Sequence, residues 1–296
     1  MSIWDFAQQE EGRAPDWDMI ARIIGLSTAL LRSGTRQIFG AGLVVRDGVL
    51  HPVMLAQFAK IVPDDFRPQI EQFGSAGDLY DIVANALGAR PEWMNAFYVY
   101  RCAPPIMLQQ PGDPITNPLP GTIGCGVKWA KKFGFMTAGH VAAPVNTTVA
   151  DQNGPLGVVV YSNDPAGHGS AIEDDVAVVE LPQGHAPVPA YAGPGNGQPG
   201  EWVDVELRAN KRSAQLMGYN YYLYLPPYNG TCGDVYFTSQ QVTVPGDSGA
   251  PVTKRNGTAI GHVLGASPGF ATYIQDVNYQ LGRIGAQAPF AGIKLA

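Results

Sequence analysis

The chain has 296 residues with a formal net charge of −6, and 45% of its residues are hydrophobic while 15% are charged. This length and apolar fraction allow a packed core in one large domain or two ordinary ones, and they exclude wholesale disorder. The acidic balance disfavours nucleic acid as a partner, and 36 glycines with 25 prolines favour many short strands joined by turns over a helical bundle.

The N-terminal residues and the cysteines together indicate a cytoplasmic protein. Residues 1–11 lack the basic start and apolar run of a signal peptide, and no apolar run reaches the roughly 18 residues of a membrane span, so we expect no membrane partner. Cys102, Cys125 and Cys232 show neither paired spacing nor a Cys-x-x-Cys motif. We therefore expect free buried thiols, with no disulfide scaffold and no metal site.

Two stretches rich in proline and glycine, 103–121 and 182–200, predict linkers or long surface connections. In the block before them, a helix is expected between Asp16 and Gly34 and another at 79–87. Strands are expected at 37–45 and 49–61. This block contains no catalytic or cofactor motif, so we interpret it as a small α/β packing or regulatory domain.

The two later blocks, at about 122–181 and 201–296, are dominated by short apolar runs bounded by turn residues. Strands are predicted at 133–137, 157–161, 176–181, 202–207, 235–238, 259–264 and 271–275. Regular short strands with glycine-rich turns indicate antiparallel barrels or a sandwich.

The first chemical motif is Thr137-Ala138-Gly139-His140, in which a predicted strand ends in small residues and then a histidine. A serine nucleophile needs a neutral imidazole as general base, held where its ring can face a cleft. His140 is therefore a candidate general base, although one histidine among five carries little weight alone.

The second motif is an acidic pair, Asp174-Asp175, directly before the apolar run at 176–179. An acid at the start of a buried strand can accept the ring N–H of a catalytic histidine and stabilise the imidazolium that forms. Asp175 is preferred to Asp174 because it immediately precedes the apolar run. A solvated acidic turn is the alternative for this segment in isolation.

The third motif, Gly246-Asp247-Ser248-Gly249, is the most specific of the three. Its glycines let the backbone turn so that the N–H groups of Gly246 and Ser248 point together, which would form an oxyanion hole beside the Ser248 hydroxyl. The order His, Asp, Ser, with each residue beside a predicted strand, makes coincidence a minor explanation.

These three motifs closely resemble the catalytic motifs of chymotrypsin-like serine proteases, and the stretch at 121–127 is similar to the strand that opens the first barrel in many bacterial members. The resemblance covers about residues 119–290. It implies a mainly β fold of two six-stranded antiparallel barrels, at about 119–181 and 201–290, with a connection at 182–200. The chain would then divide into an N-terminal α/β domain with a Pro-rich linker (1–118) and a protease domain (119–296).

The resemblance also implies roles: Ser248 is the nucleophile, His140 the general base and acid, and Asp175 the orienting carboxylate. No cofactor or metal is implied, because a triad with an oxyanion hole suffices for this chemistry. Relatives that create a new N-terminal amine pair it with the acid before the nucleophile. Over a hundred residues precede the barrels here, so Asp247 is expected to pair with an internal cation or backbone donors instead.

Substrate preference is expected to be apolar. By motif position, Val242 lies at the floor of the primary specificity pocket, with Thr243 beside it, and an apolar floor offers no partner for Lys or Arg. The strand that binds the substrate backbone is expected near Leu264, Gly265 and Ala266. His262 is out of register with the histidine of glutamate-cutting relatives, so we interpret it as a core or barrel-interface residue.

The sequence thus predicts a serine endopeptidase that acts on proteins or peptides. Two interpretations of residues 1–118 stay open: a packing domain, or a domain that holds the protease inactive until a regulatory protein partner releases it. The alternative function is a catalytically silent binding or scaffold protein on a protease fold, since fold does not imply function.

Overall fold

The computed structural model describes residues 38–46, 49–56, 98–101, 106–107, 115, 118–151, 154–169, 171–183, 191–207, 210–225 and 229–296, together with Ala21 and Gly25, which are helical. The remainder of the first predicted helix and the predicted helix at 79–87 lie outside the described residues. Within the described part of the chain, no helix is both long and apolar enough to cross a membrane.

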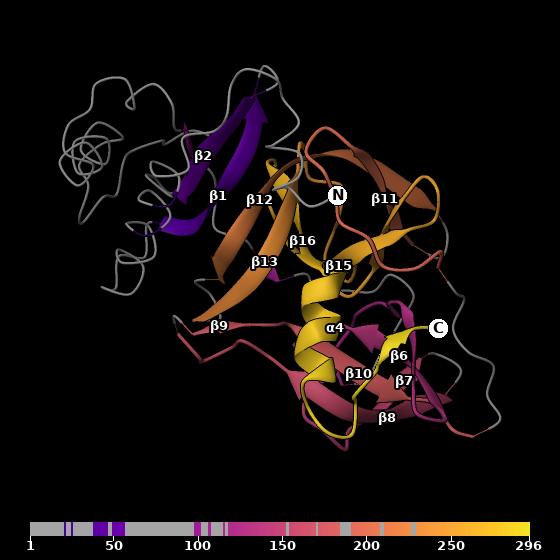
Figure 1. Cartoon of the computed structure of the whole chain (residues 1–296). Helices are drawn as coiled ribbons and strands as arrows, with labels where there is room; N and C mark the ends of the chain where they lie inside the picture. Colours follow the sequence, from indigo (N-terminus) through magenta and orange to yellow (C-terminus); the bar gives the residue numbers. More distant parts are fainter. Residues whose placement is uncertain are drawn as a thin grey trace.

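Six strands of the C-terminal half form a closed antiparallel barrel (Figure 1), which we call the second barrel. They are β11 (Trp202–Glu206), β12 (Lys211–Leu225), β13 (Gly230–Thr238), β14 (Pro251–Lys254), β15 (Ala259–Ser267) and β16 (Ala271–Asp276). The order is β12-β11-β14-β15-β16-β13, and the pairing of β13 with β12 closes it. Its interior is filled by buried apolar side chains from all six strands, among them Val203, Leu216, Tyr236, Val252 and Ile274. The buried apolar residues at the far end of β12 do not belong to this group.

Strand β12 extends beyond this barrel and carries further strands on its edge. β1 (Ile38–Arg46) pairs with it, β2 (Val49–Ala56) pairs with β1, and β3 (Tyr98–Arg101) runs parallel to β2. β1 and β2 are the predicted antiparallel pair of the N-terminal block, and they lie beside β12 and β13 in Figure 1. The described strands of that block therefore share a sheet with the second barrel instead of forming a sheet of their own.

Two short strands complete the sheet that contains the second barrel. β4 (Ile106–Met107) pairs with β15, and β9 (Ile172–Glu173) runs parallel to β13. Both come from segments that precede the second barrel in the sequence, so earlier parts of the chain pair with β15 and β13 as well as with β12.

The other half of the fold is a six-stranded antiparallel sheet, which we call the first sheet. Its order is β17 (Lys294–Leu295), β5 (Gly126–Trp129), β6 (Lys132–Thr137), β10 (Val176–Glu180), β8 (Gly154–Asn163) and β7 (Thr148–Asp151). The C-terminal strand β17 reaches this sheet through α4 (Val277–Gly285), which follows β16 and is capped by Asp276 (Figure 1). Phe290, after the helix, packs on the rings of Trp129 and Tyr161.

The predicted fold class is confirmed: the chain is mainly β, with two antiparallel six-stranded units. Every strand predicted in the later blocks overlaps an observed strand. The domain boundaries at 118/119 and around 182–200 stay predictions. The structure adds that the sixth strand of the first sheet comes from the C-terminus, outside the range 119–181 expected for that unit.

Candidate active site

His140 lies in the turn that follows β6, at the edge of the first sheet. Strand β6 pairs with β10 so that Thr137, near the end of one strand, is opposite Ala177, near the start of the other. The residues just after β6 and just before β10 therefore meet. Turn hydrogen bonds from Val141 N to Ala138 O (3.1 Å) and from Ala142 N to Gly139 O (3.1 Å) fix the loop that carries His140.

The structure brings His140 to Asp175. The ring Nδ1 of His140 lies 2.6 Å from Asp175 Oδ2, and the backbone N–H of His140 donates to Asp175 Oδ1 at 2.8 Å. Asp175 is fully buried and His140 is 5% exposed, so both contacts are shielded from water. Because a carboxylate only accepts, the pair favours the tautomer with the proton on Nδ1 and leaves Nε2 as the basic atom.

Asp174, the alternative acid, is directed elsewhere. Its carboxylate accepts from Tyr161 OH at 2.8 Å and from Asn163 Nδ2, and Arg283 Nε lies 3.4 Å away. Its partners thus lie on β8 and α4. The preference for Asp175 as the histidine's partner agrees with this geometry.

Ser248 lies in a tight, buried turn between β13 and β14. The flanking glycines adopt positive φ angles, +99° at Gly246 and +85° at Gly249, which L residues rarely adopt. Ser248 Oγ lies 3.5 Å from Leu264 O on β15, and Gly249 N donates to Val263 O at 2.9 Å. The turn is thereby attached to the edge of β15.

Thr122 joins this turn to the loop of His140, and sequence reasoning gave it no role. Thr122 N donates to Ser248 O and Thr122 Oγ1 donates to Gly246 O, both at 2.9 Å. Thr137 Oγ1 in turn donates to Thr122 O at 2.8 Å. A Cβ on Gly249 would stand 2.9 Å from the backbone nitrogen of Ala138, two residues before His140. The segments of His140 and Ser248 are therefore in direct contact.

The acid before the serine has the internal partners that the sequence predicted. Asp247 Oδ2 accepts from Arg212 Nη1 and from Val244 N, each at 2.8 Å, while the Asp247 side chain is 2% exposed. Burial raises the pKa of the Asp247 carboxyl, and the hydrogen bond from Val244 and the Arg212 guanidinium oppose that rise. Asp247 N donates to Val244 O at 3.1 Å, so this turn is held from several sides. The oxyanion-hole role of Gly246 and Ser248 stays a prediction.

The predicted substrate-binding residues lie on the second barrel, in the segment before the Ser248 turn and on β15. Val242 is half-buried, and its N–H donates to Thr272 Oγ1 at 3.0 Å, while the hydroxyls of Thr243 and Thr272 lie 2.9 Å apart. Val242 packs against the same apolar cluster that contains Ala266. Thr272 on β16 is a further polar residue here that the motifs did not indicate. Gly265 and Ala266 pair with β4.

His262 has the barrel-interface position that its register predicted. Its Nε2 accepts from Cys125 N at 3.0 Å, and its Nδ1 lies 2.8 Å from Gln280 Oε1. Complete burial lowers its pKa from 6.5 to about 4, so the ring is neutral near pH 7 and Nδ1 carries the proton. His262 thus connects the start of the first sheet to α4.

A polar chain continues from this histidine to Asp175. Gln280 Nε2 donates to Gln275 Oε1 at 3.1 Å, and Gln275 Oε1 also accepts the backbone N–H of Asp175 at 2.8 Å. All of these side chains are buried. The backbone of Asp175 is therefore oriented by the second barrel as well as by the first sheet.

The remaining sequence expectations concern cysteines and metals. Cys125 and Cys232 are free and buried as predicted, and burial raises the pKa of both thiols, whereas Cys102 lies outside the described residues. Among the described residues, no group of three or more His, Cys, Asp or Glu is placed so that it could hold a metal ion.

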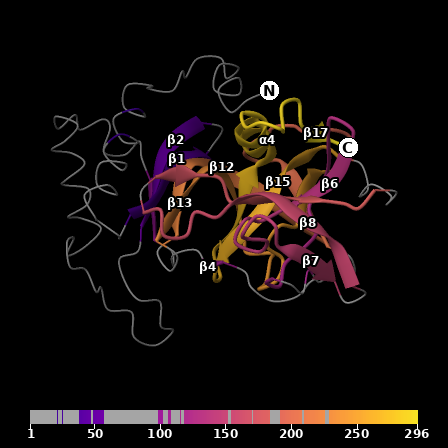
Figure 2. The same ribbon diagram turned by 90° about the horizontal axis from the view of Figure 1, so that it is seen from below.

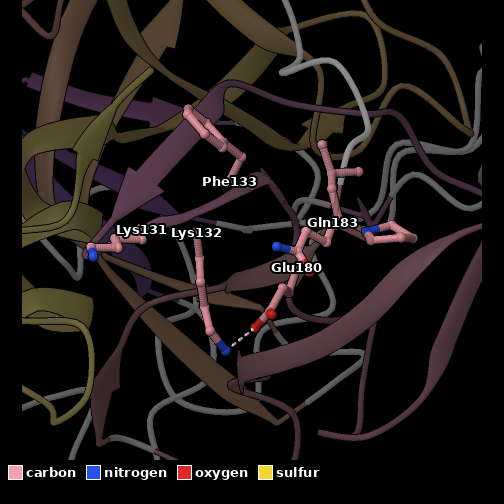
Figure 3. Close-up of a pocket in the computed structure, with 7 residues that line it drawn as sticks. Lys131, Lys132, Phe133, Glu180 and Gln183 are labelled. Atoms are coloured by element: carbon pink, nitrogen blue, oxygen red, sulfur yellow. Dashed lines mark hydrogen bonds and ion pairs between the residues drawn. The ribbon is translucent and has the colours of Figure 1, made fainter.

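A pocket of about 460 Å³ lies at the other end of β6 from His140 (Figure 3). It is lined by Lys131, Lys132, Phe133, Glu180, Leu181, Pro182 and Gln183. Lys132 and Glu180 form an exposed ion pair at 2.8 Å, which is typical of a solvated hairpin. A strand of this length separates the pocket from His140 by roughly 20 Å, so the pocket is a different feature from the candidate active site.

Comparison with solved structures finds several bacterial proteases. A Nocardiopsis protease is 22% identical, with a TM-score of 0.48 and coverage of 64% of this chain and 98% of that one. Thermobifida fusca protease A is 21% identical, with a TM-score of 0.47 over 64% and 98%. Cellulomonas bogoriensis chymotrypsin is 22% identical, with a TM-score of 0.47 over the same shares. No family model and no curated protein matches the chain. At this level of similarity, function has to be inferred from the residues of the site.

Proposed function

We propose that this chain is a serine endopeptidase that uses Ser248, His140 and Asp175. The observation that carries the proposal is the buried 2.6 Å contact between His140 Nδ1 and Asp175 Oδ2, formed next to the Ser248 turn, whose glycines adopt positive φ angles. A buried acid that orients a histidine, with a serine turn hydrogen-bonded to the same loop through Thr122, is the arrangement that activates a hydroxyl for acyl transfer.

In the proposed reaction, Ser248 Oγ attacks the carbonyl carbon of the substrate while His140 Nε2 takes the hydroxyl proton. Asp175 keeps the proton on Nδ1 and stabilises the imidazolium that forms. The N–H groups of Gly246 and Ser248 would stabilise the negative oxygen of the tetrahedral intermediate. His140 then protonates the leaving amine, and water, activated by the same ring, hydrolyses the ester to release the product and restore Ser248.

The proposed substrate is an extended peptide with a small or medium apolar residue before the cleaved bond. Val242 supports this preference because it packs with apolar side chains and offers no counter-charge to Lys or Arg. The edge of β15 at Leu264, Gly265 and Ala266 supports backbone recognition, because β4 already pairs there by main-chain hydrogen bonds, and an extended peptide that took the place of β4 would pair in the same way.

The first test is covalent labelling with a fluorophosphonate probe, which reacts with activated serines. We expect the wild-type protein to be labelled, the Ser248→Ala and His140→Ala variants to lose labelling, and cleavage of casein to follow the same pattern. Ser239→Ala, which changes an exposed serine on the same barrel, should label like the wild type. Circular dichroism of each variant checks that the fold is retained.

The alternative of a silent binding protein makes the opposite prediction. A folded wild-type protein that neither reacts with the probe nor cleaves casein or apolar peptides would contradict the proposed function and favour that alternative. Labelling that persists in Ser248→Ala would show that another serine reacts, and it would equally contradict the assignment.

A further inference from the structure

The carboxylate of Asp175 has few contacts that could fix its position. Among the described residues, its only hydrogen-bond donors are the backbone N–H and the ring Nδ1 of His140, at 2.8 and 2.6 Å. A carboxylate that bonds only to the residue it orients can hold that residue in place only if its own main chain is held. Asp175 directly precedes β10 and lies just outside the paired residues of the first sheet. The alignment of the pair therefore depends on what holds the backbone of Asp175.

Gln275 supplies this support from the second barrel. Its Oε1 accepts the backbone N–H of Asp175 at 2.8 Å. Its Nε2 donates to Gly233 O on β13 at 2.9 Å and to Glu173 O on β9 at 3.3 Å. Glu173 and Asp175 flank Asp174, so one carboxamide bonds to the main chain on both sides of that residue. The acidic segment is thereby attached to β13 and β16 through a single side chain.

The partners of Gln275 determine which way its carboxamide faces. Asp175 N and Gln280 Nε2, the latter at 3.1 Å, can only donate, so both require the oxygen of Gln275. The carbonyl oxygens of Gly233 and Glu173 can only accept, so both require its NH₂ group. Gln275 is fully buried, and no water competes for these partners. A carboxamide that accepts twice and donates twice has one orientation in this site.

The carboxamide of Gln275 is itself held by a further buried side chain. Gln280 on α4 donates to it and accepts from His262 Nδ1 at 2.8 Å, while His262 Nε2 accepts from Cys125 N at 3.0 Å. α4 packs against β15 and β16, which carry His262 and Gln275 (Figure 2). The series of hydrogen bonds therefore runs from the start of the first sheet, through the second barrel, and back to the acid of the first sheet.

We propose that Gln275 is a positioning residue of the candidate active site, which holds the main chain of Asp175 so that the carboxylate stays aligned on His140. This inference rests on the proposed function of the same site. Among the described residues, no side-chain hydrogen bond joins Gln275 to Ser248 or to the predicted substrate-binding residues. Gln275 thus acts on the reaction only through Asp175.

The test is steady-state cleavage of an apolar peptide by the full-length chain across a range of pH. Gln275→Met keeps a side chain of similar length but leaves Asp175 N without its acceptor in a buried site. We expect kcat to fall about 100-fold, because small displacements of a catalytic group are this costly. A displaced carboxylate also stabilises the His140 imidazolium less, so the acid limb of kcat/KM should move to lower pH by about half a unit.

A merely structural role would give different readouts. Partial unfolding lowers the fraction of active protein, which titration with the fluorophosphonate probe counts, but it leaves the pH profile of the remaining molecules unchanged. Distortion of β16 would raise KM, because Thr272 on this strand bonds to Val242 N and lies beside the hydroxyl of Thr243. A positioning role predicts instead that KM stays within about twofold of the wild type while kcat per labelled molecule falls.

Three further variants sharpen the comparison. Gln215→Met is the matched control, since Gln215 on β12 donates to Gly200 O at 2.7 Å and belongs to neither part of the candidate site; kcat, KM and the pH profile should be unchanged. Gln275→Glu keeps an oxygen acceptor for Asp175 N and should recover at least about tenfold in kcat over Gln275→Met. Gln280→Met removes one hydrogen bond to Gln275, and we expect a loss of about tenfold in kcat with a shift of the acid limb in the same direction.

The outcomes separate this inference from the proposed function. Folded Gln275→Met with an unchanged kcat, an unmoved acid limb, or a raised KM as its main defect would overturn the positioning role and leave the triad assignment in place. A Gln275→Glu variant no more active than Gln275→Met would overturn it as well. If Gln275→Met does not fold, Gln280→Met decides by the same two readouts, kcat and the acid limb. Absence of probe labelling in the wild type would instead contradict the proposed function itself.

Discussion

The first sheet and the second barrel contribute different parts of the candidate active site. The second barrel is closed by the β12–β13 pairing, and it carries the Ser248 turn and the β15 edge. The first sheet runs from β17 to β7 and carries His140 and Asp175 at adjoining ends of β6 and β10. The candidate nucleophile and the proposed substrate edge thus belong to one unit, and the candidate general base with its orienting carboxylate belongs to the other.

Because the two parts of the candidate site lie on different units, their alignment depends on the contacts between these units. Thr122 bonds to the Ser248 turn and to Thr137, Cys125 bonds to His262, and Gln275 bonds to the backbone of Asp175. These hydrogen bonds are buried, and breaking one leaves a polar group without a partner, which costs about 1–3 kcal/mol. The site is therefore expected to be sensitive to changes at the interface as well as to changes in the triad.

The largest expected effect comes from the acid of the first sheet. Asp175→Asn should lower kcat by about 10⁴-fold, because an amide no longer fixes the Nδ1–H tautomer or stabilises the imidazolium. The measurement is steady-state cleavage of an apolar peptide. Asp174→Asn is the neighbouring control, since Asp174 bonds to Tyr161 and Asn163, and its kcat should stay within about tenfold of the wild type. An equal loss in both variants would contradict the assignment of Asp175.

The next largest effect tests the close approach of the two units at Gly249. Gly249→Ala would place a Cβ 2.3 Å from Thr137 Oγ1 and 2.7 Å from Thr122 O, at a φ of +85°. We expect about 1–2 kcal/mol of backbone strain and about 1–3 kcal/mol from the forced separation, together with a large loss of activity.

Gly167→Ala is the matched control for this change. Gly167 has a φ of +82°, and a Cβ there meets nothing within 4 Å, so the backbone cost is similar and no clash follows. Urea denaturation measures the loss of unfolding free energy in each variant, and the difference between the two losses is the cost of the clash. Equal destabilisation would mean that the contact between the serine turn and the end of β6 is looser than the structure indicates.

The sequence pointed to the three candidate catalytic residues because each of them lies in a short local motif. His140, Asp175 and Ser248 each stand beside an apolar run, and the glycines around Ser248 mark a turn in the sequence itself. The strands that were predicted have the same property, since an apolar run between turn residues is a local signal. An internal cation or backbone donors were expected as partners of Asp247, but the sequence did not identify Arg212 as that cation.

The parts that were missed depend on contacts between residues far apart in the sequence. Thr122, Gln275 and Gln280 are polar residues without a motif, and their roles appear only when the two units meet. Strand β12 is long because its two halves have different partners, β11 and then β1, which no local pattern encodes. Strand β17 has two residues and forms only because α4 returns the chain to β5.

A smaller effect concerns the histidine between the two units. Burial lowers the pKa of His262 from 6.5 to about 4, so between these values the unfolded chain binds more protons than the folded one. This group's contribution to stability is fully present above the unfolded pKa and is lost as the pH falls towards 4, by about 3 kcal/mol in total. His262→Gln removes the titration.

The measurement is the difference in unfolding free energy between wild type and His262→Gln at about pH 7 and about pH 5. We expect the wild type's advantage to shrink by about 2 kcal/mol over that range. Burial raises the pKa of Asp276 to about 6, which has the opposite sign, but this residue is present in both proteins and cancels in the difference. A constant difference would mean that His262 is accessible to protons in the folded chain.

The smallest effect tests how the second barrel supports its own serine turn. Arg212→Met removes the cation from Asp247, whose carboxylate would keep only the hydrogen bond from Val244 N. We expect a loss of about 2 kcal/mol in unfolding free energy, the value of a hydrogen bond to a buried charge, and reduced kcat because the Gly246–Ser248 turn loses an anchor.

Lys211→Met is the control at the neighbouring position. Lys211 is 60% exposed and pairs with Glu206, so its removal should change stability by less than about 0.5 kcal/mol. If both variants behaved alike, the Arg212–Asp247 pair would be a surface contact, and the turn would depend on Thr122 of the first unit instead.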